Sequence, residues 1–137
     1  MVYKAAAILL FTTALFGTET DVAEAPYESD YAKGQPDRQL WRDIKDSFLR
    51  HRFGKILKKH NLALGCAGCT SVFMDVSFAV TEQGTVQIRG IDRQQACGHD
   101  FPAAMKTDFL KFLNDYPYPK PLHRTTVRLR LGSGLKC

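Results

Sequence analysis

The stretch FMDVSFAVTEQGTVQIRGI, residues 73–91, sets the expectation for the whole fold. Between Met74 and Val80, apolar side chains alternate with polar or small ones, which predicts a strand with one buried face. Glu82–Gly84 is typical of a tight turn, because its glycine adopts a positive φ without steric cost. The alternation then resumes, so the stretch predicts a hairpin whose second strand ends at Gly90, with a loop from there to Asp100.

Amphipathic helices are predicted before and after this hairpin. Asp37 is a favourable cap for a helix that runs to about His60. Pro102 suits the first turn of a second helix, which ends near Asn114. Both helices have an apolar stripe, made by Leu40, Ile44, Phe48, Ile56 and Leu57 in the first and by Phe101, Met105, Phe109, Phe112 and Leu113 in the second.

A third strand, Thr125–Leu131, directs Val127 inward and Arg128 and Arg130 outward. Because each strand has one apolar face, we expect an α+β two-layer sandwich of order α-β-β-α-β. Its helices would lie on one face of a three-stranded antiparallel sheet. The second helix returns the chain along the sheet, so antiparallel pairing throughout requires the spatial order 2-1-3.

The first residues are typical of a secretory signal peptide. Lys4 supplies a positive charge, and Ala5–Phe16 is an uncharged run too short to span a bilayer. We expect a signal at residues 1–17 with cleavage between 17 and 25, and a retained anchor is the alternative. A flexible lead-in at 18–37 and one domain at 38–137 would follow, in the periplasm or secreted.

The four cysteines converge at one end of the predicted sheet. Structural disulfides fit export and the even cysteine count. Two alternatives stay open. Cys66 and Cys69 form a C-x-x-C motif, as in thiol–disulfide oxidoreductases, although here it precedes a strand rather than a helix. A zinc site would combine Cys66, Cys69 and Cys97 with Cys137 or His99.

Taken in order, these segments resemble the C-terminal periplasmic domain of TolA and TonB. The resemblance covers about Arg38–Leu131 and includes the hairpin with its T-x-x-G turn at Thr81–Gly84. A cysteine precedes the first strand, and Cys97–Asp100 leads into the second helix. Phe112–Pro121 is similar to the proline-rich link that precedes the last strand of TolA domains.

The resemblance implies protein–protein recognition in the periplasm, often by addition of a strand to the sheet edge. It also implies one disulfide between the cysteine just before the first strand and the cysteine leading into the second helix. Cys69 lies closest to that strand, which favours Cys69–Cys97 together with Cys66–Cys137. The reverse assignment, Cys66–Cys97 with Cys69–Cys137, stays open.

We therefore expect a non-enzymatic interaction domain without cofactor or metal. An envelope or secretion-system protein, with acidic residues at alternate positions, would add to the third strand as the longer edge of the sheet. The candidate partner-binding residues are Arg124, Val127, Arg128 and Arg130. The alternative function is a periplasmic thiol–disulfide oxidoreductase that uses Cys66 and Cys69.

The net charge of +5 favours acidic partners, and export disfavours nucleic acid. The first helix carries a basic face that is typical of a solvated surface. A weak contact with a membrane surface is the other interpretation of this face, which comprises Arg50, Arg52, Lys55, Lys58 and Lys59.

Overall fold

The computed structural model describes residues 26–28 and 36–137. The predicted signal peptide, residues 1–17, lies outside the described residues, as do residues 18–25 and 29–35 of the predicted lead-in.

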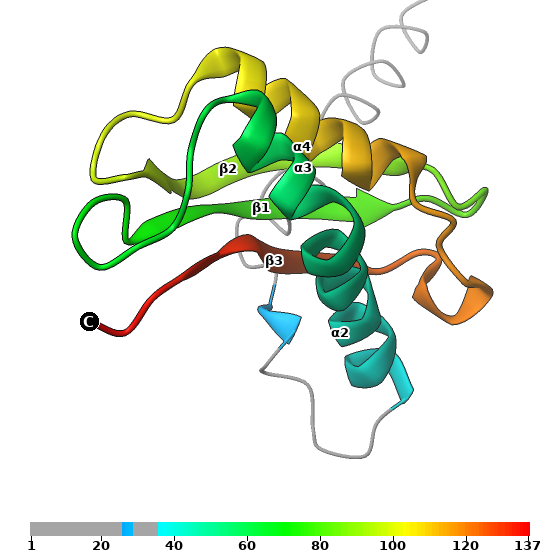
Figure 1. Cartoon of the computed structure of the whole chain (residues 1–137). Coiled ribbons are helices and arrows are strands. Elements are labelled where there is room, and N and C mark those ends of the chain that lie inside the picture. Colours follow the sequence, from blue (N-terminus) through cyan, green and yellow to red (C-terminus); the bar gives the residue numbers. More distant parts are fainter. Residues whose placement is uncertain (1–25, 29–35) are drawn as a thin grey trace, which may run out of the picture.

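The structure confirms the predicted α+β fold (Figure 1). Three strands form an antiparallel sheet: β1 (Ser71–Val80), β2 (Val86–Ala96) and β3 (Thr126–Gly134). Their spatial order is β2-β1-β3, which is the order that antiparallel pairing requires when a helix returns the chain along the sheet.

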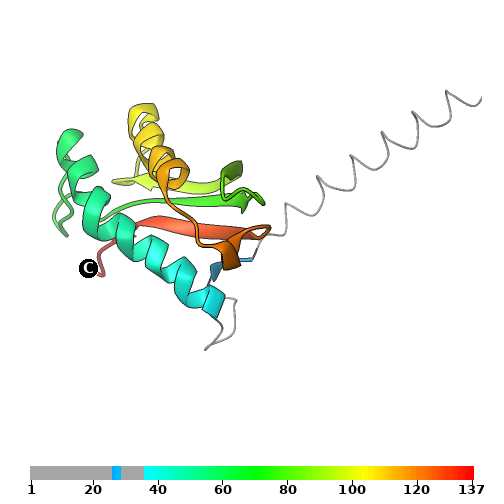
Figure 2. The same cartoon turned by 90° about the vertical axis from the view of Figure 1, so that its right-hand side faces the viewer.

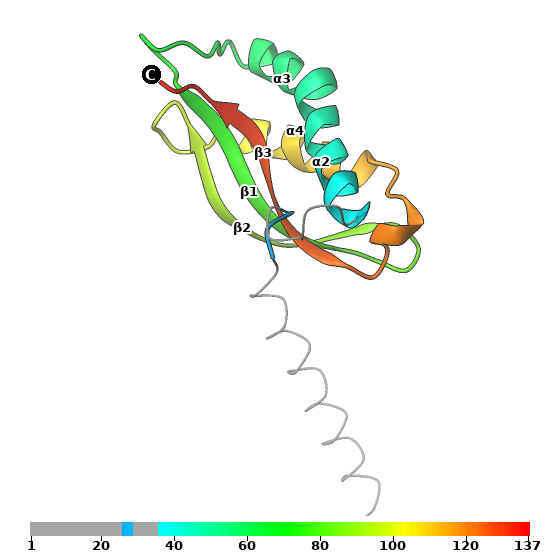
Figure 3. The ribbon, with the colours of Figure 1, turned by 90° about the horizontal axis from the view of Figure 1, so that it is seen from below.

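The helices cover one face of this sheet (Figure 3). The first predicted helix is a continuous helical segment in three parts, and the second matches its expected position. The elements are α2 (Pro36–Phe48), the π-helical turn η3 (Leu49–Phe53), α3 (Gly54–Lys59), α4 (Ala103–Asp115) and the short 3₁₀ helix η4 (Lys120–Leu122).

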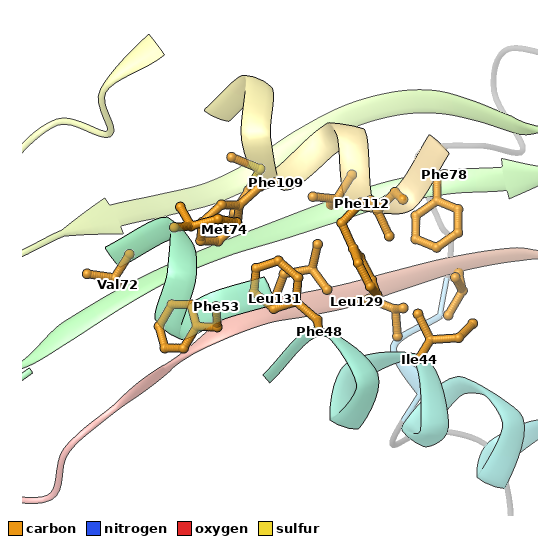
Figure 4. Close-up of a cluster of buried hydrophobic side chains, with 14 of the residues drawn as sticks. Ile44, Phe48, Phe53, Val72, Met74, Phe78, Phe109, Phe112, Leu129 and Leu131 are labelled. Atoms are coloured by element: carbon orange, nitrogen blue, oxygen red, sulfur yellow. The ribbon is translucent and has the colours of Figure 1, made fainter. Parts of the chain in front are cut away.

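The core lies between the helices and the sheet, and aromatic side chains dominate it (Figure 4). Phe48 of α2 is its centre, with ring centroids 4.8 Å from Phe109 and 5.0 Å from Phe112 of α4. Leu129 and Leu131 of β3 are fully buried beneath these rings. The inward positions that the sequence predicts for β1 and β3 are therefore core positions.

The first helix contains a π-helical turn that the sequence pattern did not predict. Phe48 and Phe53 are five residues apart, a spacing that places two side chains on different faces of an α-helix. A π-helix, whose hydrogen bonds span five residues, brings them to the same face. Both rings are buried, with centroids 5.7 Å apart. The turn thus keeps the apolar face toward the sheet in both α2 and α3.

Strand β2 is longer than the sequence indicated. We expected it to end at Gly90, with a loop to Asp100, but it continues to Ala96. Its pairing with β1 has two register shifts, which leave Arg89 and Asp92 as extra residues. Each bulge breaks the period-two alternation, so the second half of the strand has no readable strand pattern. The expectation that the third strand is the longer edge is also wrong.

The connector Tyr116–Pro121 leads from α4 toward β3. It is extended as far as Pro119 and then forms the 3₁₀ turn η4. The buried Tyr118 hydroxyl donates a hydrogen bond of 2.7 Å to the carbonyl of Leu113, near the end of α4. Burial raises the pKa of Tyr118.

Gly132→Ala should destabilise the sheet strongly. Gly132 has a φ of 111°, and a Cβ there would lie 2.2 Å from the carbonyl oxygen of Val72. We expect the free energy of unfolding in urea to fall by roughly 1–3 kcal/mol or more. Gly90→Ala is the matched control, because a Cβ on this strand glycine would meet no atom within 4 Å. Equal losses for both substitutions would contradict the steric argument.

Candidate interaction surface at the outer edge of the sheet

The outer edge of β3 carries a short segment of the chain itself. Tyr27 forms a parallel β-bridge with Arg128, and the Arg128 N–H donates a hydrogen bond of 2.9 Å to the carbonyl of Pro26. Figure 3 shows this segment, in blue, beside β3. The edge of the third strand, where we expected a partner to add, is therefore already paired at Arg128. Pro26–Glu28, assigned to a flexible lead-in from the sequence, lies against the domain instead.

Side chains from three elements hold this segment. The Arg128 guanidinium lies 4.3 Å from the centroid of the Tyr27 ring, and the Tyr27 hydroxyl lies 3.5 Å from Asp75 Oδ2 of β1. Glu28 is buried and accepts a hydrogen bond of 2.5 Å from Lys45 Nζ of α2. The surface that receives Pro26–Glu28, called the seat below, thus offers the edge of β3, Arg128 and Asp75 as contacts for a tyrosine, and Lys45 as a cation for a carboxylate.

Asp75 is the electrostatic centre of the sheet face that the helices leave uncovered. Its carboxylate has no solvent exposure and accepts two hydrogen bonds from Arg130, of 2.7 Å from Nε and 2.9 Å from Nη2. The Arg130 guanidinium also lies 4.2 Å from the centroid of the Phe73 ring. The hydrogen bonds to Asp75 raise the pKa of Arg130.

The four predicted partner-binding residues do not form one site. Arg128 and Arg130 share the outer face, but Arg130 is bound to Asp75 rather than directed at a partner. The side chain of Val127 is fully buried in the core. Backbone N–H groups alternate in direction along a strand, so the N–H of Val127 points toward β1 because that of Arg128 points outward. Arg124 lies at the hairpin end of the sheet in an exposed ion pair with Glu82, which stabilises little.

Sequence reasoning missed Tyr27, Glu28, Lys45 and Asp75. Asp75 could have been found, because an acidic residue on the polar face of a strand favours a basic residue opposite it on the neighbouring strand. Arg130 occupies that position on β3. Tyr27 and Glu28 had none, because three residues are too few to show a period.

Arg130→Met should destabilise the domain, because it leaves the buried Asp75 carboxylate without its cation. Arg130 is 44% exposed. We therefore expect a loss of roughly 2–3 kcal/mol in urea unfolding, at or below the range for fully buried pairs. Arg93→Met is the matched control, because Arg93 lies opposite Asp75 in the backbone register of β1 and β2 and is 5.7 Å from the Phe73 ring. A loss no larger than that of the control would contradict the assigned role.

The cysteines form two disulfides, Cys66–Cys137 and Cys69–Cys97, with Cα–Cα distances of 5.6 Å and 4.3 Å. This is the pairing that the family resemblance favours. The segments that carry them lie at one end of the sheet (Figure 2). Each cysteine of the C-x-x-C motif is bonded to a distant partner, so no thiol remains for zinc or for dithiol exchange. Disulfides of this kind are typical of exported proteins.

Non-reducing peptide mapping should recover the same two pairs, and titration of the native protein should find no reactive thiol. Replacing Cys66 and Cys137 together by serine should lower the free energy of unfolding by about 2–4 kcal/mol, because the bridge closes a long loop. A Cys66–Cys69 bridge in the native protein would contradict this structure and favour the redox function.

The predicted basic surface lies on η3 and α3, where Arg50, Arg52, Lys55, Lys58 and Lys59 are exposed. A groove of about 190 Å³ separates α3 from α4 and includes Arg52, Lys55 and Lys111 in its walls.

One acid, Asp108, lies in this groove, 3.0 Å from both Lys59 Nζ and His60 Nε2. Hydrogen bonds from His60 and then from Lys59 lower the pKa of Asp108. The acid is therefore already paired within the chain, and the surface as a whole presents positive charge.

Across residues 26–28 and 36–137, no helix is long and apolar enough to cross a bilayer, and no group of three or more His, Cys, Asp or Glu is placed to hold a metal ion. In comparisons with protein-family models, curated proteins and solved structures, nothing matches this chain. Its resemblance to the TolA and TonB domains therefore rests on the motifs quoted above.

Proposed function

We propose that this chain is an exported, non-enzymatic protein–protein interaction domain of the TolA/TonB C-terminal type. It binds an extended segment of an envelope or secretion-system protein as an added strand on β3. The observation that carries this proposal is the seat of Pro26–Glu28, where the outward N–H of Arg128 already pairs with the carbonyl of Pro26 and Tyr27 forms a β-bridge with the strand.

The two edges of the sheet differ in their fitness for strand addition. β3 pairs with β1 without a register shift from Thr126 to Gly134, so its outward groups follow one another along the whole strand. β2 has two register shifts, and bulges twist an edge and interrupt its donors and acceptors. A partner strand therefore fits β3 better than β2.

The alternative, a thiol–disulfide oxidoreductase, gains no support from the cysteine pairs. Exchange at a C-x-x-C motif needs its two sulfurs to bond to each other, whereas Cys66 and Cys69 are bonded to Cys137 and Cys97. The contact with a membrane surface stays a prediction for the exposed basic surface of η3 and α3.

Two substitutions at one position separate backbone pairing from side-chain contacts. Arg128→Pro removes the outward N–H donor, and Arg128→Ala keeps it while removing the same guanidinium. From envelope extracts, the wild-type domain should capture a partner. R128A should retain part of it, because the backbone donor remains while the cation beside the aromatic ring is lost, and R128P should lose it. Quantitative mass spectrometry of the captured proteins provides the measurement.

Circular dichroism and urea unfolding must first show that both variants are folded. Retention of the partner by a folded R128P variant, in the amount that R128A retains, would exclude strand addition at β3.

A further inference from the structure

The seat on β3 contacts side chains as well as the backbone of the segment it binds. Pro26–Glu28 is held at three points that belong to different elements: a backbone hydrogen bond to β3, a ring between Arg128 and Asp75, and an ion pair with Lys45 of α2. Strand pairing alone would be indifferent to sequence. The second and third points select an aromatic residue, preferably tyrosine, followed directly by a carboxylate.

Two of the groups that receive the segment are placed by the fold itself. Asp75 is held by two hydrogen bonds from Arg130, so its carboxylate keeps its place beside the Tyr27 hydroxyl. Lys45 extends from α2, whose neighbours Ile44 and Phe48 are fully buried in the core. A site built on such elements needs little reorganisation to bind a ligand.

The internal segment uses a small part of the edge. The bridge at Arg128 is the one β-bridge that residues 26–28 make with β3, which runs on to Gly134. A longer partner strand would add hydrogen bonds toward that end and could replace the segment. The chain's own copy, attached through a short stretch to α2, is present at a high effective concentration and weakens binding of any competitor.

We propose that Pro26–Glu28 is an internal competitor for the partner, and that the partner presents the same chemistry: an extended segment parallel to β3, with an aromatic residue followed by Asp or Glu. This inference rests on the proposed function, since it specifies the segment that the β3 edge receives. Binding of the partner displaces Tyr27 and Glu28. While these two residues occupy the seat, the affinity of the domain for the partner is lower.

The test uses the whole disulfide-bonded chain and a fluorescent peptide of its own residues 24–30, EAPYESD. In the variant with Tyr27→Ala and Glu28→Ala the seat is vacated. Fluorescence anisotropy should show that this variant binds the peptide roughly tenfold more tightly than the wild type. This ratio follows for an effective concentration of the tethered segment of about 1 mM and an intrinsic dissociation constant of about 0.1 mM. A peptide with alanine at the positions of Tyr27 and Glu28 is the control and should not bind.

Charge exchange gives a second, independent readout. Lys45→Glu in the vacated variant should abolish binding of EAPYESD, and a peptide with lysine at the position of Glu28 should bind this variant again. Equal affinity of the wild type and the vacated variant, no binding to either, or no effect of the exchange would each overturn the inference. A wild-type dimer that the peptide dissociates would overturn it too, because the occupant would then be a second copy of the chain.

These outcomes are separate from those of the capture experiment. If R128P loses an envelope partner but the peptide results are negative, internal competition fails and strand addition stands. If a folded R128P keeps the partner, strand addition to a foreign protein fails even when the peptide binds.

Discussion

The central strand β1 is buried on both faces, and the rest of the structure depends on this burial. Its helix-facing residues need an apolar cover, which the layer around Phe48 supplies. Its other face places the Asp75 carboxylate out of contact with water, where a charge needs a close counter-ion. Arg130 meets that need only in the present register, because a slip of one residue would turn it to the opposite face and bring a leucine in its place.

Stability and recognition share this arrangement. The ion pair that makes Asp75 tolerable in the sheet also fixes the oxygen that faces Tyr27, and the helix that closes the core also extends Lys45 toward Glu28. A binding seat made from groups that the fold already requires adds little conformational entropy loss when it is filled. The two arginines on the outer face of β3 are therefore not interchangeable. Arg130 pairs with Asp75 inside the domain, whereas Arg128 contacts the Tyr27 ring at the sheet edge.

Much of the fold follows from periodicity, and the exceptions have definite causes. β1, β3, both helices and the sheet order were predictable, because each element shows one buried face. The far half of β2 was hidden by the bulges at Arg89 and Asp92, and the π-helical turn by the five-residue step between Phe48 and Phe53. The seat of Tyr27 depends on tertiary contacts over a very short segment, which leaves no local pattern in the sequence.

The position of the two disulfides has a mechanical consequence. Both lie at the end of the sheet where β3 finishes, and Cys137 is bonded to Cys66, ahead of the first residue of β1. Tension that draws β3 toward its final residues would pass through covalent bonds into the loop before β1, so the hydrogen bonds between the two strands would not be sheared in sequence. At the opposite end, where a turn joins β1 to β2, the pairing of β1 with β3 is not secured by a disulfide and would yield first. The sheet therefore resists tension at the end where the disulfides tie its strands and yields more readily at the other end.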